Sequence, residues 1–532
     1  MNPATERRAC HVLAAAMIFA ALAYGVYTTW PHQWPAGPDT LRDIASAETI
    51  RASIGHTLQR GEPLPDPYYR NEVFWYSPLM PALLAAGAAV TRAPMHLVAV
   101  RLPIFWNLAG PILFYMLACE LFDPLAALAA LALFLFVEPF ASREAATYGS
   151  ALVTSSFAQP FFYGGLLAWI RFRKTMRTRA AVLAGVVLGV SFLAHTVPTA
   201  LLAIVFSIET IAWLWRTRRS TEFRRVFATC ALVVGVGVIC ASPAMVPLAH
   251  YHMRIKELEP FVYRDPSVAP ADLSELLRTN AFVFFFSVPA LVGLIALPFQ
   301  RESGSRRIVL TWLVASTALF FWAAYAVRLI EWDGLAKFAI APAHHFMIYA
   351  RAAESLIGGL GIAAVCRLAG KWTKPGIAWP LAVVVSAALV AASLPRYPMR
   401  DRVMIPATYS ESQWAAVQWM ADKSAPGSVF LAPENTGVSM IGVAGRHTVI
   451  VGPIFSNPYV DWEFRDRERQ DMWAALTASN CVEFERHANP FAVTHLLLVD
   501  GMTPDIHPGA CGFERVFDQP PFTILSRVPS AR

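Results

Sequence analysis

The chain has 532 residues and a formal net charge of +7 at pH 7. Hydrophobic residues make up 56% of the sequence and charged residues only 15%, whereas soluble domains carry roughly 25% charged residues. This composition argues against an ordinary soluble protein and favours a membrane protein. The excess of positive charge does not indicate nucleic acid binding, because the basic residues cluster in short segments between apolar runs.

Apolar runs of the length needed to cross a membrane recur through the chain. A helix needs about 20 apolar residues to cross the hydrocarbon core, and on that measure about eleven spans are expected. They begin near Val12, Leu97, Pro124, Leu152, Ala180, Pro198, Val226, Ala281, Ile308, Phe346 and Ile377. The apolar stretch from Pro78 to Val90 is too short to count and is expected to lie beside the membrane.

Basic residues predict which side of the membrane each loop faces. Lys and Arg concentrate in short cytoplasmic loops, and one arrangement of the spans places every basic cluster on the same side. The clusters are Arg7 and Arg8, Arg171 to Arg179, Arg216 to Arg225, Arg301 to Arg307, and Arg367 to Lys374. The N-terminus is then cytoplasmic, and the odd number of spans places the C-terminus outside.

The sequence therefore predicts a mainly α fold, a polytopic bundle of membrane helices over residues 1–400, with a first exterior loop at 30–77. Residues 401–532 are expected to form a small soluble α/β domain on the extracytoplasmic side. Its expected elements are a helix at Ser412 to Asp422 and strands at Ser428 to Ala432, His495 to Val499 and Phe522 to Val528. In an oxidising compartment Cys481 and Cys511 are candidates for a disulfide.

Two carboxylates follow the first span. Asp39 and Asp43 are four residues apart at a predicted helix start, so they share one face of that helix. A carboxylate at the membrane surface can deprotonate a hydroxyl group or hold a divalent cation. The alternative is that Asp39 is an N-cap residue after Gly37 and Pro38 and that Asp43 is a solvated charge.

Further candidates lie at the expected exterior ends of other spans. His195 stands in a tight turn, where it would bind a metal or a phosphate, or alternatively cap a helix. His344, His345 and Arg351 enter the membrane from outside, and His344 and Arg351 share a face because they are seven residues apart. Arg351 is the first candidate for phosphate, since a guanidinium group matches phosphate oxygens.

Two other ionisable residues are expected at membrane depth. Glu138 lies near the exterior end of its span, and such a group indicates a functional site or a carboxylate that reaches the interface. Glu209 lies nearer the cytoplasmic end, where a structural pairing with Arg216 is expected.

The tail contains a segment with the residue types that bind sugars. It has aromatic, amide and charged side chains close together in sequence: Arg446, His447, Asn457, Tyr459, Asp461 and Trp462. The charged run from Glu463 to Arg469 is expected to be a solvated helix face.

Three stretches of the chain resemble the GT-C superfamily of multi-spanning glycosyltransferases, which use polyprenyl-phosphate sugars. The first is the exterior loop, with its acid at Asp39, a helix from Ala45 to Leu58, Gly61 and the segment DPYYRNEVFWYSPLMP. The second is RLPIFWNLAGPILFYMLACELF, and the third is EPFASREAATYG, which contains Glu138, Arg143, Glu144 and Tyr148.

This resemblance implies a function and a site. It implies inverting transfer of a sugar from a polyprenyl-phosphate donor to a glycan, lipid or protein hydroxyl group outside a bacterial inner membrane. Asp39, with Asp43 as the second candidate, is then the general base or metal-linked acid. The residues expected to contact the substrate or its phosphate are Arg351, His344, Glu138, Arg143, His195 and Tyr76. A divalent cation, Mg²⁺ or Mn²⁺, would have ligands among Asp39, Glu138 and His344. The alternatives are a transporter or flippase for a lipid-linked substrate, and an inactive scaffold.

Overall fold

The computed structural model describes residues 3–35, 37–136, 147–149, 152–252, 288–300, 302–323, 343–373, 375–393, 409–453, 455–506 and 509–527. The chain divides into two compact units. The first unit comprises Met1–Pro31, Val100–Pro243 and Pro266–Ile405, and the second comprises His32–Ala99, Ala244–Asp265 and Pro406–Arg532.

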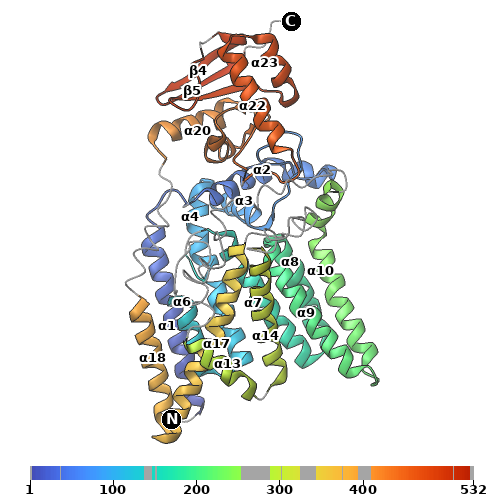
Figure 1. Ribbon diagram of the computed structural model, residues 1–532, viewed down its shortest axis with the longest axis vertical. Helices are drawn as coiled ribbons and strands as arrows, with labels where there is room; N and C mark the ends of the chain where they lie inside the picture. Colours follow the sequence, from blue (N-terminus) through green and yellow to red (C-terminus); the bar gives the residue numbers. More distant parts are fainter. Residues whose placement is uncertain are drawn as a thin grey trace. The chain divides into compact units, whose positions relative to one another are not determined.

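The first unit is a bundle of helices that lie side by side (Figure 1). A helix corresponds to each of the eleven predicted spans, with α4 and α5 together forming the second of them. The helices are α1 (Pro3–Thr29), α4 (Met95–Trp106), α5 (Ala109–Leu121), α6 (Pro124–Phe136), α7 (Thr154–Thr175), α8 (Thr178–Ala194), α9 (Thr196–Thr217), α10 (Phe223–His252), α13 (Val288–Ala296), α14 (Ser303–Phe321), α17 (Ala343–Trp372) and α18 (Ala378–Ser393). Residues 95–99 of α4 and 244–252 of α10 are grouped with the second unit. Short 3₁₀ turns follow α13 (η3, Leu297–Phe299) and α17 (η5, Pro375–Ile377).

Five helical segments have the length and the apolar composition that a membrane crossing requires. They are Ala4–Thr29, Met95–Leu121, Thr196–Thr217, Phe223–Pro247 and His345–Trp372. Shorter apolar helices, among them Pro124–Phe136 and Thr178–Ala194, lie beside them in the bundle. These helices are those of a membrane protein.

The centre of the bundle depends on small residues in α17. A Cβ atom on Gly359 would collide with backbone atoms of Ala126 and Ala130 in α6, and one on Gly361 would collide with the backbone of α13. Glycine at these positions lets the helix backbones approach closely, which is how membrane helices gain packing energy when no water is excluded between them. The long helix α17 therefore packs directly against α6 and α13.

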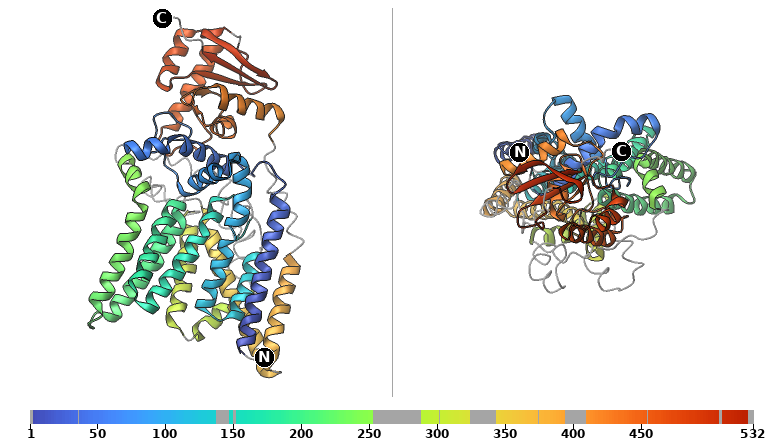
Figure 2. Two further views of the ribbon diagram at one scale, coloured as in Figure 1. Left: turned by 180° about the vertical axis from the view of Figure 1, so that it is seen from behind. Right: turned by 90° about the horizontal axis from the view of Figure 1, so that it is seen from above.

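The second unit combines the first loop with the C-terminal tail (Figures 1 and 2). The loop forms α2 (Pro38–Arg60) and α3 (Leu79–Thr91). The tail contains α20 (Glu411–Lys423), β1 (Val429–Leu431), α21 (Glu434–Thr436), η7 (Gly437–Gly442), β2 (His447–Thr448), α22 (Trp462–Thr477), α23 (Cys481–Ala488), η8 (Asn489–Phe491), β3 (His495–Val499), η9 (Ala510–Gly512), β4 (Phe513–Gln519) and β5 (Phe522–Arg527). The division at residue 400 stays a prediction, and the structure groups residues 32–99 with the tail.

The tail has one mixed sheet with strand order β2-β1-β3-β5-β4. Strand β1 is parallel to β2 and β3, whereas β5 is antiparallel to β3 and β4. Side chains of α22 and α23, including Met472 and Phe484, pack with Val429 and Leu431 of β1. Helix α20 lies against the sheet through Trp419, whose ring contacts His495 and Phe517. The predicted helix and three strands of the tail are all present.

Cys481 and Cys511 form a disulfide with a Cα–Cα distance of 5.0 Å. The bond joins the first residue of α23 to the 3₁₀ turn that precedes β4. The other five cysteines are free.

Glu209 is completely buried in the first unit, and its partners differ from the predicted one. Its carboxylate forms ion pairs with Arg173 of α7 and Arg307 of α14 instead of Arg216 of its own helix. Arg307 donates two hydrogen bonds to it, one of them from Nη2 to Oε2 at 2.8 Å. The structural role expected for Glu209 is therefore to join three helices.

We expect Glu209→Gln to destabilise the protein, because two guanidinium groups would lose the carboxylate that balances them. Removal of one member of a buried ion pair costs about 3 to 5 kcal/mol. The measurement is the thermal unfolding midpoint of the full chain in detergent. Glu120→Gln is the control, since Glu120 pairs with Lys174 at 2.9 Å but both side chains are about one-third or more exposed, and such pairs contribute about 0 to 1 kcal/mol. Equal midpoints for the two variants would contradict the assigned role.

Candidate functional site

The first candidate site lies at the start of α2. Gly37, with φ at +84°, is the N-cap residue, and Pro38 opens the helix. Asp39 then falls in the first turn, where the helix dipole favours negative charge. Its side chain is 46% exposed, whereas that of Asp43 is 1% exposed. The alternative of an Asp39 cap and a solvated Asp43 is therefore wrong on both points.

Arg42 connects the candidate acids of this loop. Its Nη2 lies 3.3 Å from Asp39 Oδ1 and its Nε lies 3.8 Å from Asp43 Oδ1. Nη2 also donates a hydrogen bond of 2.9 Å to the hydroxyl of Tyr76. Burial disfavours the charged guanidinium, but Tyr76, Asp39 and Asp43 outweigh it and raise the pKa of Arg42. The structure thus gathers Asp39, Arg42, Asp43 and Tyr76 into one group, which we name the Arg42 cluster.

The Arg42 cluster has two carboxylates of different character. Asp43 is buried and serves to hold the guanidinium, while Asp39 contacts the same cation but remains open to solvent. An exposed carboxylate held in place in this way is able to accept a proton from a hydroxyl group that comes within hydrogen-bond distance. Sequence analysis named the acids and Tyr76 as candidates but did not single out Arg42, although its spacing from Asp39 is typical of an ion pair.

The loop is anchored to the tail through Asp66. Asp66 Oδ1 accepts hydrogen bonds from the backbone N–H groups of Tyr68 and Tyr69 at 2.8 and 3.0 Å. Oδ2 accepts a third bond of 3.0 Å from Asn457 Nδ2. Burial raises the pKa of Asp66 to about 6, against the lowering by these donors and by Arg465. The guanidinium of Arg465 lies 4.1 Å above the Tyr69 ring and strengthens the same contact.

Most sugar-binding candidates in the tail prove to be engaged within the protein. Arg446 donates to the backbone and hydroxyl of Ser424 at the end of α20. Asn457 binds Asp66, Asp461 caps α22, and Trp462 Nε1 donates to a backbone carbonyl. These contacts are structural, so the predicted sugar site loses most of its members. Arg465 likewise contradicts the expectation that the charged run of α22 is only solvated.

His447 and Tyr459 remain from that set. Burial lowers the pKa of His447 to about 4, so its ring is neutral at physiological pH. Its Nδ1 has no hydrogen-bond partner among the residues that the structure describes. Tyr459 is half-buried, and its backbone N–H donates to Asn457.

A second group of candidates lies in the first unit. His195 is 5% exposed and caps α9, since its Nδ1 accepts a hydrogen bond of 3.1 Å from the N–H of Val197. Its ring meets that of His345 edge to face, with centroids 4.8 Å apart. Arg351 is also buried, at 4% exposed. Glu138 and Arg143 lie outside the described residues, as does the side chain of His344.

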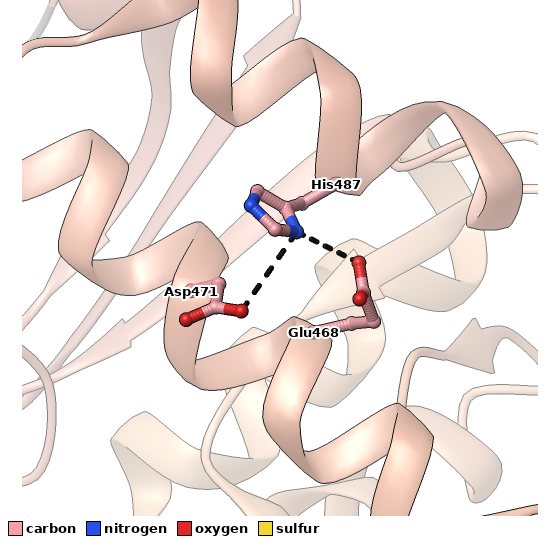
Figure 3. Close-up of side chains that lie close together, drawn as sticks. All are labelled: Glu468, Asp471 and His487. Carbon is pink, nitrogen blue, oxygen red and sulfur yellow. Dashed lines mark hydrogen bonds and ion pairs between the residues drawn. The ribbon is translucent and has the colours of Figure 1, made fainter.

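A third group lies between α22 and α23 (Figure 3). His487 Nδ1 lies 2.8 Å from Glu468 Oε2 and 4.0 Å from Asp471 Oδ2. On its other side Nε2 lies 3.3 Å from Glu483 Oε1 and 2.8 Å from Arg486 Nη2. An imidazole and two carboxylates are donors that suit Zn²⁺, but the neighbouring guanidinium and carboxylate also form an ordinary ion-pair network between two helices.

The fold of this chain is similar to that of several solved structures, whereas no protein-family model and no curated protein matches its sequence. The crystal structure of ArnT from Cupriavidus metallidurans bound to undecaprenyl phosphate has a TM-score of 0.55 at 13% identity, with 98% of each chain covered. The archaeal oligosaccharyltransferase AglB from Archaeoglobus fulgidus, in complex with an inhibitory peptide and a dolichol-phosphate, has a TM-score of 0.56 at 12% identity, covering 91% of this chain and 69% of that one.

A further structure of the Archaeoglobus fulgidus enzyme, in complex with Zn and sulfate, has a TM-score of 0.52 at 14% identity over 91% of this chain and 68% of the other. All three structures are of GT-C glycosyltransferases. This chain has a GT-C-type fold. The fold predicted from the sequence resemblance is therefore confirmed, and the chain is a membrane protein of that architecture. The roles of the individual residues stay predictions.

The raised pKa of Asp66 predicts a pH dependence of stability. Above about pH 4 the unfolded chain releases this proton, whereas the folded protein keeps it until about pH 6, so the free energy of unfolding should fall as pH rises through that window, by roughly 3 kcal/mol. In the Asp66→Asn variant this part of the pH dependence of the free energy of unfolding should be absent. The measurement is the thermal midpoint of the full chain between pH 4.5 and 7, with Asp500→Asn, the loss of an exposed carboxylate in the same unit, as control.

The pairing itself can be tested by exchange. Asp66→Asn combined with Asn457→Asp keeps one carboxylate and one amide facing each other, so it should regain stability that the single variant loses. A double variant that is no more stable than Asp66→Asn, or a single variant with the wild-type pH profile, would contradict the assignment.

Proposed function

We propose that this chain is a glycosyltransferase that moves a sugar from a polyprenyl-phosphate donor to an extracytoplasmic glycan, lipid or protein hydroxyl group, with inversion. The observation that carries the proposal is the half-exposed carboxylate of Asp39, held by Arg42 at the start of α2 in a chain with a GT-C-type fold. ArnT, which shares this fold over nearly its whole length, binds undecaprenyl phosphate. An anionic lipid carrier of this kind is the donor class that we assign to this chain.

In the proposed reaction Asp39 accepts the proton of the acceptor hydroxyl group. The hydroxyl oxygen forms a bond to the anomeric carbon as the bond from that carbon to the phosphate oxygen breaks. Asp43 and Tyr76 hold Arg42, and Arg42 in turn positions Asp39. Asp43 is the second candidate for the base.

The leaving group of this reaction is a polyprenyl phosphate, which needs hydrogen-bond donors and positive charge. Arg351 is buried and belongs to a helix that is long and apolar enough to cross the membrane. We assign Arg351 to the phosphate, with His195, His344 and Arg143 as further donors and Glu138 as a residue that contacts the substrate.

The orientation proposed for the chain has its N-terminus in the cytoplasm and its second unit outside, in a bacterial inner membrane. The basic clusters at Arg171 to Arg179 and Arg216 to Arg225 are then cytoplasmic. The disulfide between Cys481 and Cys511 supports this orientation, because such bonds persist in oxidising compartments.

A divalent cation is part of the expected site, with ligands among Asp39, Glu138 and His344. Asp39 is the member of this set with a described side chain, and its Oδ1 lies 3.3 Å from the guanidinium of Arg42. That positive charge disfavours a second cation at the same carboxylate. The surroundings of Asp39 therefore do not fit a metal ion, and the proposed proton transfer uses none.

We expect Asp39→Asn to reduce the transfer rate about 10² to 10⁴-fold, because the amide cannot accept the proton of the hydroxyl group. Asp43→Asn should reduce it as well, through loss of the partner that holds Arg42. The matched control is Glu48→Gln, a carboxylate of the same helix that pairs with Arg51 at the surface and should keep wild-type activity. The measurement is transfer of labelled sugar from a polyprenyl-phosphate donor by the full chain in nanodiscs.

Full activity of both aspartate variants would overturn the proposed mechanism. Binding of the donor without turnover by the wild-type protein would favour a scaffold, and movement of the lipid across vesicles without transfer would favour a flippase.

A further inference from the structure

A cavity of about 390 Å³ lies between α7 and α14 in the first unit. Small-molecule pockets have volumes of roughly 300 to 1,000 Å³, so this cavity is large enough for a ligand. The end of α7 and the start of α14 line it, and the lining includes Ile170, Arg173, Lys174, Ser303, Ser305 and Ile308. The proposed sugar transfer uses none of these residues and leaves the cavity without a role.

The lining of the cavity changes from polar to apolar along the two helices. Arg173 and Lys174 lie in the last turn of α7, and Ser303 is the first residue of α14, so cations and a hydroxyl group line one end. One turn further into each helix the lining residues are Ile170 and Ile308, both of which are buried. A ligand that matches this lining has a polar head and an apolar body.

Positive charge is in excess at the polar end. The single carboxylate of Glu209 pairs with two guanidinium groups, those of Arg173 and Arg307, so one of the two positive charges is not balanced within this group. Arg216 of α9 adds a further positive charge near Arg173. An anion bound in the cavity beside Arg173 would balance this excess, and the attraction is strong because the three paired side chains are at most one-quarter exposed.

Two further charged residues, Lys174 and Glu302, line the cavity with opposite sign. Lys174 pairs with Glu120 at 2.9 Å, but both side chains are about one-third or more exposed, and an ion pair of this kind is weak enough for the ammonium group to turn to a ligand. Glu302 accepts a hydrogen bond of 3.2 Å from Ser305 Oγ. Of the lining residues that the structure describes, Glu302 alone is acidic, so it alone would repel an anion.

We propose that this cavity binds the headgroup of an anionic phospholipid, with Arg173 and Lys174 at its phosphate and Ile170 and Ile308 at the start of its acyl chains. Guanidinium and ammonium groups both donate to phosphate oxygens. The apolar end favours a lipid over a free phosphate ion, which would leave the two isoleucines uncovered. Basic pockets between membrane helices are typical sites for anionic headgroups. The inference does not depend on the proposed sugar transfer.

Two substitutions of opposite effect test the site. Lys174→Gln removes a positive charge from the lining and should weaken binding of phosphatidylglycerol about fivefold, whereas Glu302→Gln removes the opposing negative charge and should strengthen it by a similar factor. The glutamine still offers an oxygen to the Ser305 hydroxyl. The matched control is Arg367→Gln, which removes a positive charge of similar exposure that pairs with Asp123 outside the cavity and should keep wild-type affinity.

Binding is measured by native mass spectrometry on the full chain in detergent, titrated with phosphatidylglycerol, phosphatidylcholine or inorganic phosphate. Tighter binding of phosphatidylglycerol than of phosphatidylcholine, with opposite shifts in Lys174→Gln and Glu302→Gln, supports the site. The gain expected for Glu302→Gln cannot result from misfolding, which would only reduce binding.

Three results would overturn the assignment. They are wild-type affinity for phosphatidylglycerol in both Lys174→Gln and Glu302→Gln, a loss in Arg367→Gln as large as that in Lys174→Gln, and equal affinity of the wild-type protein for the two lipids. Inorganic phosphate that binds as tightly as phosphatidylglycerol would also overturn it, because the occupant would then be a soluble anion.

Discussion

The hydrogen bond between Asp66 and Asn457 is the contact on which the second unit depends. It joins residues 391 positions apart in the sequence and is completely buried. Because the same carboxylate also orders the backbone of Tyr68 and Tyr69, the bond fixes both the shape of the first loop and its attachment to the tail. The ring of Tyr68 then packs against Gly442 of η7, which has no side chain to obstruct it. The loop that carries the Arg42 cluster is therefore attached to the tail at Asp66 and at Tyr68.

The ion pairs of the two units differ in their charge balance and in their exposure to solvent. At Glu209 one carboxylate faces two guanidinium groups, and all three side chains are at most one-quarter exposed. At Arg42 one guanidinium faces two carboxylates, one of them half-exposed. A buried charge is stable only when it is paired. The ion pairs of Glu209, to which we assign a structural role, meet this requirement because each buried charge has an opposite charge beside it. The Arg42 cluster instead leaves one of its two carboxylates, that of Asp39, half-exposed to solvent.

The sequence alone predicted the features that depend on neighbouring residues. The helices of the bundle, the helix and strands of the tail and the candidate acids of α2 follow from apolar runs, from period and from local spacing. The sequence did not predict partners from distant segments. Glu209 pairs with arginines of two other helices rather than with Arg216 of its own, and Asn457 binds Asp66, whereas a sugar was expected. The sequence also does not show which charged side chains are buried, so it allowed Asp43 to be interpreted as a solvated charge. Local pattern thus predicted the elements, whereas the site required the tertiary contacts.

A GT-C-type fold at 12 to 14% identity is understandable from the way the bundle packs. Apolar side chains of similar volume replace one another in a core with little loss of stability, and helix crossings need only small residues such as Gly359 and Gly361. The sequence is therefore free to change while the helices keep their arrangement. Function has to be argued from the polar groups that this packing does not explain. Arg446 and Asp461 are explained by their internal bonds, whereas the carboxylate of Asp39 stays half-exposed beside its ion pair with Arg42. The proposed function therefore rests on the half-exposed carboxylate of Asp39.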